Sequence, residues 1–265
     1  MKISEALILG AVQGITEFLP VSSSGHLVLL QRIFKISEPV LVFDTLVHGG
    51  TLIAVLVVLW QDIWNILRRP WQPLTGLLAL ATVPAVVFAL VFKGPIDRAF
   101  ESAAGLGFAF LITAAALGIS EILSKRSGRL RDGGAMTGLD ALIIGILQGI
   151  AIIPGVSRSG LTLSGALSRG LERGFAARFS FLLSIPAILG ALVFQVKDLG
   201  GGPGGGGIGP GPLIAGTAAA AAVGFFSIKF MLKLVRERSL WGFAAYTALL
   251  GLLITTDQYI GHVVF

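Results

Sequence analysis

Two short polar segments of an otherwise apolar chain carry the residues that could do chemistry. Gln13 and Glu17 are four residues apart, so on a helix they share a face and could bind one divalent cation or polar ligand. His26 lies three residues after Ser23, close enough on a helix to act as base for a serine nucleophile. The reactive residues of this segment are Gln13, Glu17, Ser22, Ser23, Ser24 and His26.

The second segment adds a positive charge and more hydroxyl groups. After Pro20 and again after Pro154 the chain can restart as a helix, with serines at the cap and first turn, where backbone N–H groups lack partners. Such helix N-termini attract anions, and a guanidinium binds phosphate oxygens bidentately. Together the two segments predict a phosphate or diphosphate site. The polar residues of the second segment are Ser157, Arg158, Ser159 and Thr162.

The composition indicates a membrane protein. Of the 265 residues, 54% are hydrophobic and 13% are charged, which is more apolar sequence than one soluble core would bury. Cysteine is absent, which excludes disulfides, thiolate metal ligands and a thiol nucleophile. The net charge of +6 does not indicate nucleic-acid binding, because the basic residues lie between apolar runs, where orientation in the membrane explains them.

We expect an all-α polytopic membrane protein with six transmembrane helices and two re-entrant helical hairpins. Residues 3–34 and 137–171 are apolar but broken in the middle by Pro20 and by Pro154-Gly155. Each arm is too short to span, so we interpret both segments as hairpins whose tips reach the midplane. Six other segments reach the roughly 20 apolar residues that a span requires. They are residues 43–64, 74–92, 102–124, 177–196, 213–234 and 240–261.

The hairpins belong to an internal duplication with an offset of 135 residues. Ala6-Leu-Ile-Leu-Gly10 recurs as Ala141-Leu-Ile-Ile-Gly145, and Val21-Ser22 recurs as Val156-Ser157. We therefore treat residues 1–265 as a single membrane domain with a first half at 1–124 and a second at 137–265. Each half crosses the membrane three times, because its hairpin does not cross. An odd number of crossings means that the second half is inverted relative to the first. In inverted repeats with broken helices, the site lies at the repeat interface near the midplane.

Charge asymmetry gives the expected orientation. With residues 125–131 in the cytoplasm, thirteen Lys and Arg residues lie on the inner side and six on the outer side. This bias puts both termini and the entrance of the first hairpin outside, so the active site would open to the outer, periplasmic side. Residues 200–212 are nearly all Gly and Pro and are expected to form a flexible outer loop. They lack the Gly-Lys-Ser/Thr ending of a P-loop.

The candidate residues also have purely structural interpretations. Glu17 and Arg158 could pair only to neutralise each other, and His26 could be a hydrogen-bonded packing residue. The serines could do no more than cap helices. We favour function because charged side chains inside a bilayer cost free energy and are functional candidates by default. Asp44 and His48 lie nearby on an apolar segment and count only as supporting candidates.

Two motifs resemble the signatures of a known family. Gln13-Gly-Ile-Thr-Glu17-Phe-Leu-Pro-Val-Ser-Ser-Ser-Gly-His26 and Pro154-Gly-Val-Ser-Arg-Ser-Gly-Leu-Thr162 look like the two motifs of undecaprenyl-diphosphate phosphatases of the bacitracin-resistance type. Phe179-Ser-Phe-Leu-Leu-Ser-Ile-Pro186 matches as well. In that family the first position is Glu or Gln. The Gln version leaves Glu17 as the only carboxylate of the pair.

The resemblance implies a multi-pass enzyme of the bacterial plasma (inner) membrane. Such an enzyme hydrolyses undecaprenyl diphosphate to undecaprenyl phosphate and inorganic phosphate, recycles the lipid carrier of cell-wall synthesis and confers bacitracin resistance. Its expected partners are the polyprenyl diphosphate and membrane lipids, without nucleic acid. The sequence leaves the oligomeric state open, a homodimer included, and it does not fix the prenyl length.

The expected mechanism uses both segments. Arg158 and the helix N-termini bind the diphosphate, while a divalent cation, Mg²⁺ or Ca²⁺, held partly by Glu17 and Gln13 neutralises its remaining charge. Ser23 attacks the terminal phosphorus with His26 as base, and water later hydrolyses the phosphoserine. Direct attack by water, with Ser23 only binding oxygen, fits equally well. The side chains expected to bind substrate are Gln13, Ser22, Ser24, Ser157, Ser159 and Thr162.

A second function class also fits the layout. A lipid-phosphate flippase or secondary transporter would have the same architecture, because inverted repeats with broken helices also occur in carriers. His26 beside the serines favours the enzyme, since a carrier needs no base next to a nucleophile.

Overall fold

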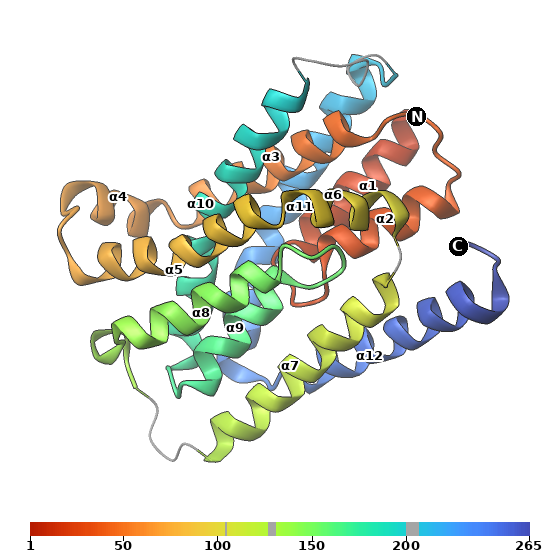
Figure 1. Ribbon diagram of the computed structural model, residues 1–265. Helices are drawn as coiled ribbons and strands as arrows, with labels where there is room; N and C mark the ends of the chain where they lie inside the picture. Colours follow the sequence, from red (N-terminus) through yellow and green to blue (C-terminus); the bar gives the residue numbers. More distant parts are fainter. Residues whose placement is uncertain (104, 127–130, 200–206) are drawn as a thin grey trace.

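The chain folds into helices throughout the part described by the computed structural model, which covers residues 1–103, 105–126, 131–199 and 207–265 (Figure 1). Within these ranges the only extended pairing is an isolated β-bridge between Arg131 and Leu171. The prediction of an all-α protein is confirmed.

Five helices in the described part are long and apolar enough to cross a membrane, and they overlap five of the six expected spans. The sixth, expected at 240–261, is α12 (Trp241–Thr256), a helix of 16 residues followed by a π-helical turn at Asp257–Gly261. The five long helices are α3 (Leu41–Val58), α5 (Pro73–Val91), α7 (Leu106–Arg126), α10 (Arg173–Leu199) and α11 (Pro210–Glu237).

The outward faces of these helices are apolar. On α5, for example, Val83, Val87 and Leu90 are exposed. Such a continuous apolar surface would be unfavourable in water and suits lipid. The protein is therefore a multi-pass integral membrane protein.

Two shorter helices connect the long ones, and the first of them starts inside the span expected at 43–64, which ends earlier, at Val58. They are α4 (Trp60–Arg68) and α6 (Lys93–Ser102). On α4 the rings of Trp60 and Trp64 stack at 5.4 Å, and the guanidinium of Arg68 lies 4.8 Å from the Trp64 ring centroid. Exposed tryptophans beside a basic residue are typical of the level at which a membrane meets water.

Each expected hairpin is a pair of helices joined by a break. The first is α1 (Ile3–Thr16) and α2 (Ser23–Ile33), and the second is α8 (Gly138–Ile150) and α9 (Arg158–Ser168). Their lengths of 14, 11, 13 and 11 residues fall below a membrane span. The breaks fall at Pro20 and Pro154, where proline removes an N–H, and Gly155 follows at φ +87°.

Small residues bring the first arm of each hairpin against a long helix of the other half. A Cβ on Gly10 of α1 would overlap the carbonyl oxygen of Gly216 on α11, and a Cβ on Gly145 of α8 would overlap that of Ala81 on α5. Backbones can approach this closely only where side chains are absent or small. Both hairpins are thereby anchored on long helices.

Ion pairs to buried carboxylates join the ends of several helices. Asp140 is fully buried and accepts from Arg131 at 2.9 Å and from Arg169 at 2.7 Å. Glu121 of α7 accepts from Arg173 of α10 at 2.7 Å. The pairs of Asp140 hold the start of α8 against the end of α9, and the pair of Glu121 holds α7 against the start of α10.

The loop expected at 200–212 lies partly outside the described residues, at 200–206. Of the remainder, Pro210 already belongs to α11, because proline is favoured at the first helical position, where its missing N–H has no helical acceptor.

Candidate active site

The tips of the two hairpins meet inside the protein. The hydroxyl of Ser159 donates to the carbonyl of Leu19 at 2.9 Å, and the amide of Gly155 donates to the hydroxyl of Ser24 at 3.2 Å. Both contacts join residues more than 130 positions apart in the chain. The break of each hairpin is thus held by a serine of the other.

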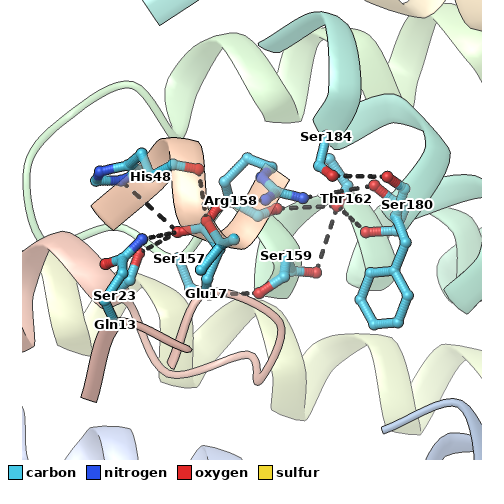
Figure 2. A network of polar contacts seen from close by, with 12 residues as sticks. Gln13, Glu17, Ser23, His48, Ser157, Arg158, Ser159, Thr162, Ser180 and Ser184 are labelled. Carbon is cyan, nitrogen blue, oxygen red and sulfur yellow. Dashed lines mark hydrogen bonds and ion pairs between the residues drawn. The ribbon is translucent and has the colours of Figure 1, made fainter. Parts of the chain in front are cut away.

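Glu17 is the centre of the polar contacts at this junction (Figure 2). It ends α1 as the C-cap residue and is only 7% exposed. One carboxylate oxygen accepts from Arg158 Nη2 at 2.6 Å. The other accepts from the Ser23 hydroxyl at 2.6 Å and from the Gln13 amide at 3.0 Å. The carboxylate therefore links the proposed nucleophile to the proposed phosphate-binding arginine.

A buried aromatic pair fixes the position of Glu17. The next residue, Phe18, is fully buried and packs edge-on against Phe181 of α10, with ring centroids 5.6 Å apart. Because α10 carries one ring and the hairpin the other, the backbone at Glu17 cannot shift without disturbing this apolar contact.

Arg158 is the first residue of α9, and its surroundings hold it in place. Its second terminal nitrogen, Nη1, lies 3.5 Å from the carbonyl oxygen of Ser180 on α10. Thr162 hydrogen-bonds the Arg158 carbonyl at 2.9 Å and the Ser180 hydroxyl at 2.6 Å (Figure 2). Thr162 thus ties the first turn of α9 to α10 rather than pointing into the site.

Both second arms start with a serine cap, as the sequence predicted. The Ser22 hydroxyl accepts from the amide of Gly25 at 3.2 Å, and the Ser157 hydroxyl accepts from that of Gly160 at 3.0 Å. Ser22 adopts φ 70°, a left-handed conformation that costs free energy in a residue with a side chain. The first two N–H groups of each arm have no acceptor within the helix and remain available to an anion.

His26 does not approach the Ser23 hydroxyl as expected. Its Nδ1 lies 2.7 Å from the carbonyl oxygen of Ser22, and its Nε2 lies 2.7 Å from the hydroxyl of Tyr246 on α12. The rings of His26 and Tyr246 also stack. His26 lies one helical turn after the serines, but its two ring nitrogens face the Ser22 carbonyl and the Tyr246 hydroxyl instead of the Ser23 hydroxyl. The base closest to Ser23 is Glu17.

Two residues that sequence patterns favour weakly or not at all, His48 and Ser180, contact the site. His48 on α3 has its Nε2 3.7 Å from Glu17 and its Nδ1 2.7 Å from the carbonyl oxygen of Asp44. Ser180, described above, lies in the stretch Phe179–Pro186 that resembles the family, and its sequence context predicts no role for it. Both are polar residues on a long apolar helix. Such residues are rare enough there to predict that each has a polar partner.

A divalent cation suits the residues at Glu17. Within the described ranges no three His, Asp or Glu side chains cluster as a metal site. However, Oε1 of the fully buried Gln13 has no hydrogen-bond partner. With Glu17 and the Ser23 hydroxyl it supplies oxygen donors of the kind Mg²⁺ and Ca²⁺ prefer, and Mg²⁺ commonly takes one carboxylate and completes its shell with phosphate oxygens and water.

Comparison with known proteins agrees with the two motifs. The family model described as bacitracin resistance protein BacA matches residues 6–253. An undecaprenyl-diphosphatase of Carboxydothermus hydrogenoformans is 48% identical over 98% of this chain and 99% of its own length. Undecaprenyl-diphosphatase 4 of Bacillus thuringiensis subsp. konkukian is 41% identical, and an undecaprenyl-diphosphatase of Methanosphaera stadtmanae is 38% identical, each over 96% of this chain and 97% of its own. With its helical hairpins and its Glu17–Arg158 junction, the chain belongs to the BacA family of bacitracin-resistance proteins.

Proposed function

We propose that this protein is a membrane phosphatase that hydrolyses undecaprenyl diphosphate to undecaprenyl phosphate and inorganic phosphate. The observation that carries the proposal is the junction of Glu17, Ser23 and Arg158, which combines a nucleophile, a proton acceptor and a phosphate-binding cation at one buried point. In a bacterial plasma membrane this reaction recycles the lipid carrier of cell-wall synthesis and confers bacitracin resistance.

Substrate binding would use the positive end of the site. The guanidinium of Arg158 has five N–H donors. One donates to Glu17 and one to Ser180, so the others can donate to phosphate oxygens. The uncapped N–H groups of α2 and α9 would add backbone donors around the diphosphate. Serine hydroxyls from both tips lie beside these donors.

The chemical step would begin at Ser23, whose hydroxyl already donates to Glu17 at 2.6 Å. Glu17 takes the proton as the serine oxygen bonds to the terminal phosphorus, and the bridging P–O bond breaks to release undecaprenyl phosphate. Water then cleaves the phosphoserine and releases inorganic phosphate. The alternative, in which Glu17 activates water directly, uses the same contacts.

His26 takes a different role from that of base in this proposal. Because its ring bonds the Ser22 carbonyl, it would orient the first hairpin tip and keep the Ser23 hydroxyl aligned. A divalent cation, Mg²⁺ or Ca²⁺, would be held by Glu17 and Gln13. When bound, it neutralises phosphate charge and so stabilises the transition state.

The overall arrangement we propose is an inverted repeat of six spans, with α12 as the sixth and the hairpins re-entrant. Support comes from the 135-residue offset, which relates Gly10 to Gly145 and Ala81 to Gly216. The contact of Gly10 with Gly216 thus repeats as that of Gly145 with Ala81, with the halves exchanged. Such exchange is typical of a two-fold relation between halves.

The positive-inside bias supports an active site open to the periplasmic side, whereas a homodimer stays a prediction.

The decisive experiment is phosphate release by the purified protein in detergent, where transport has no meaning. Undecaprenyl diphosphate should yield inorganic phosphate with the wild-type protein and essentially none with Arg158→Ala. Absence of phosphate release from a folded wild-type protein, together with movement of the labelled lipid across vesicles, would replace this proposal with the flippase or transporter.

A further inference from the structure

An apolar cavity of about 590 Å³ lies beside the first hairpin, between α1, α11 and α12. Its lining includes Ile15, Leu19, Val21, Leu234, Gly242 and Phe243. On α12 the lining residues follow one helical face from Gly242 to Tyr246, over about 6 Å of helix. The chemistry proposed above uses none of this space.

The cavity begins where the polar site ends. Thr16 and Leu19, both in its wall, flank Glu17, and the carbonyl of Leu19 accepts from Ser159 of the other tip. His26 also lines it and is bonded to the carbonyl of Ser22, the residue before Ser23. The same short stretch of chain thus presents polar atoms to the junction and apolar side chains to the cavity.

The lining suits a hydrocarbon and nothing charged. The hydroxyl of Thr16 is bonded to the Val12 carbonyl, and His26 and Tyr246 are bonded to each other, so these polar side chains have partners already. The remaining polar lining residue, Ser239, is exposed. The volume falls within the range of about 300–1,000 Å³ usual for ligand pockets. Ile15 is 42% exposed and Tyr246 45%, so the cavity opens sideways towards the surface.

We propose that this cavity holds the first isoprene units of the substrate's polyprenyl chain. The inference rests on the proposed function, because a diphosphate at the junction has its prenyl chain attached and that chain must leave through an apolar passage. The cavity adjoins the hairpin that carries Ser23 and opens to the side, so the rest of the chain can continue into the bilayer. A smaller cavity of about 150 Å³, lined by Ile153 and Pro154 of the second hairpin, is the competing route.

Filling the cavity tests the proposal. A Cβ on Gly242 would meet nothing within 4 Å, so Gly242→Leu can be accommodated while occupying the cavity. We expect KM for undecaprenyl diphosphate to rise roughly tenfold, with kcat nearly unchanged, because apolar burial of the tail is lost. Gly76→Leu, on α5, is the matched control, since a Cβ there is equally free. An unchanged KM in folded Gly242→Leu would refute the proposal.

Photo-crosslinking of the wild-type protein gives a result that needs no variant and no turnover. A prenyl diphosphate with a diazirine on its second isoprene unit should label Ile15, Leu19 or Phe243, and excess undecaprenyl diphosphate should compete this labelling away. Labelling there that resists competition would mean that any membrane acyl chain fills the cavity, and labelling of Ile153 or Pro154 would favour the smaller one. Either result overturns the proposal. Competed labelling without phosphate release would keep this lipid site and reject the phosphatase.

Discussion

Arg158 lies with its Nη2 2.6 Å from Glu17 Oε1, which joins two hairpins across 141 positions of sequence. Each residue belongs to a segment that is too short to span a membrane, and each is largely buried. Two charges in such a place are tolerated because they are paired. The pair therefore has two consequences, one for stability and one for catalysis, and mutations can separate them.

Arg158→Ala should abolish most activity and also destabilise the protein. Loss of a countercharge for the diphosphate should lower phosphate release by roughly a hundredfold or more. Glu17 left alone should cost about 3–5 kcal/mol, visible as a lower Tm in detergent. Adding Glu17→Gln to Arg158→Ala should restore Tm without activity. Recovery of activity in the double variant would show that the pair is only structural.

The hairpins could be predicted from sequence, but the partners of several side chains could not. Proline, serine and glycine act on their own neighbours, so the breaks at Pro20 and Pro154 and the caps at Ser22 and Ser157 follow from local chemistry. The bond from His26 to Tyr246 spans 220 positions. No local pattern encodes such a contact, because it depends on how α12 packs.

Ser23→Ala distinguishes the two attack mechanisms. If the serine is the nucleophile, kcat should fall by roughly a thousandfold, since Glu17 then has no hydroxyl to deprotonate. Mass spectrometry of wild-type protein quenched during turnover should find phosphate on Ser23. Ser227→Ala is a suitable control, because that hydroxyl only bonds the Val223 carbonyl within α11. Near-normal turnover by Ser23→Ala would leave direct attack by water.

His48 should matter through a single contact. Its Nδ1 donates to the Asp44 carbonyl, so Nε2 alone faces Glu17, at 3.7 Å, where the charged form of the ring makes an ion pair with the carboxylate. His48→Gln keeps a polar group at this position and should retain kcat within about threefold, whereas His48→Leu should lower it roughly tenfold. Equal kcat values for the two variants would mean that Glu17 does not depend on this contact.

Asp140 should make stability depend on pH at the acid end. Burial raises the pKa of its carboxyl, but hydrogen bonds from Thr137, Arg169 and Arg131 outweigh this and lower the pKa from 3.8 to about 2. A carboxyl whose pKa is lower in the folded than in the unfolded state stabilises the fold at pH values above its unfolded-state pKa. This contribution of about 2 kcal/mol is lost as the pH falls from about 4 to about 2.

Asp140→Asn should consequently lower Tm at pH 7, and its difference from wild type should shrink as the pH falls towards 2. Thermal unfolding in detergent across this range measures both effects. Asp62→Asn provides the comparison, because its partner Arg178 lies 3.5 Å away and the pair is partly exposed. A pH-independent difference for Asp140→Asn would show that packing, not ionisation, explains its effect.

Gln13→Glu tests whether the junction binds a divalent cation. The amide of Gln13 donates to Glu17 while its Oε1 has no partner, and a cation would bring both oxygens to one ligand shell once the amide group turned over. A second carboxylate four residues before Glu17 should strengthen cation binding, because Mg²⁺ affinity rises with the charge of its ligands. Without a cation, the same change sets two carboxylates side by side and should destabilise the protein.

The readout is therefore Tm as a function of Mg²⁺ concentration, in addition to phosphate release. Gln13→Glu should have a lower Tm than wild type in EDTA and should gain more from added Mg²⁺, with half of the gain reached at a lower concentration. Gln148→Glu is the matched control, because Gln148 occupies the equivalent position of the second hairpin, where Ile152 replaces the acid. A Tm for Gln13→Glu that does not respond to Mg²⁺ or Ca²⁺, or an equal response by Gln148→Glu, would exclude a cation at Glu17.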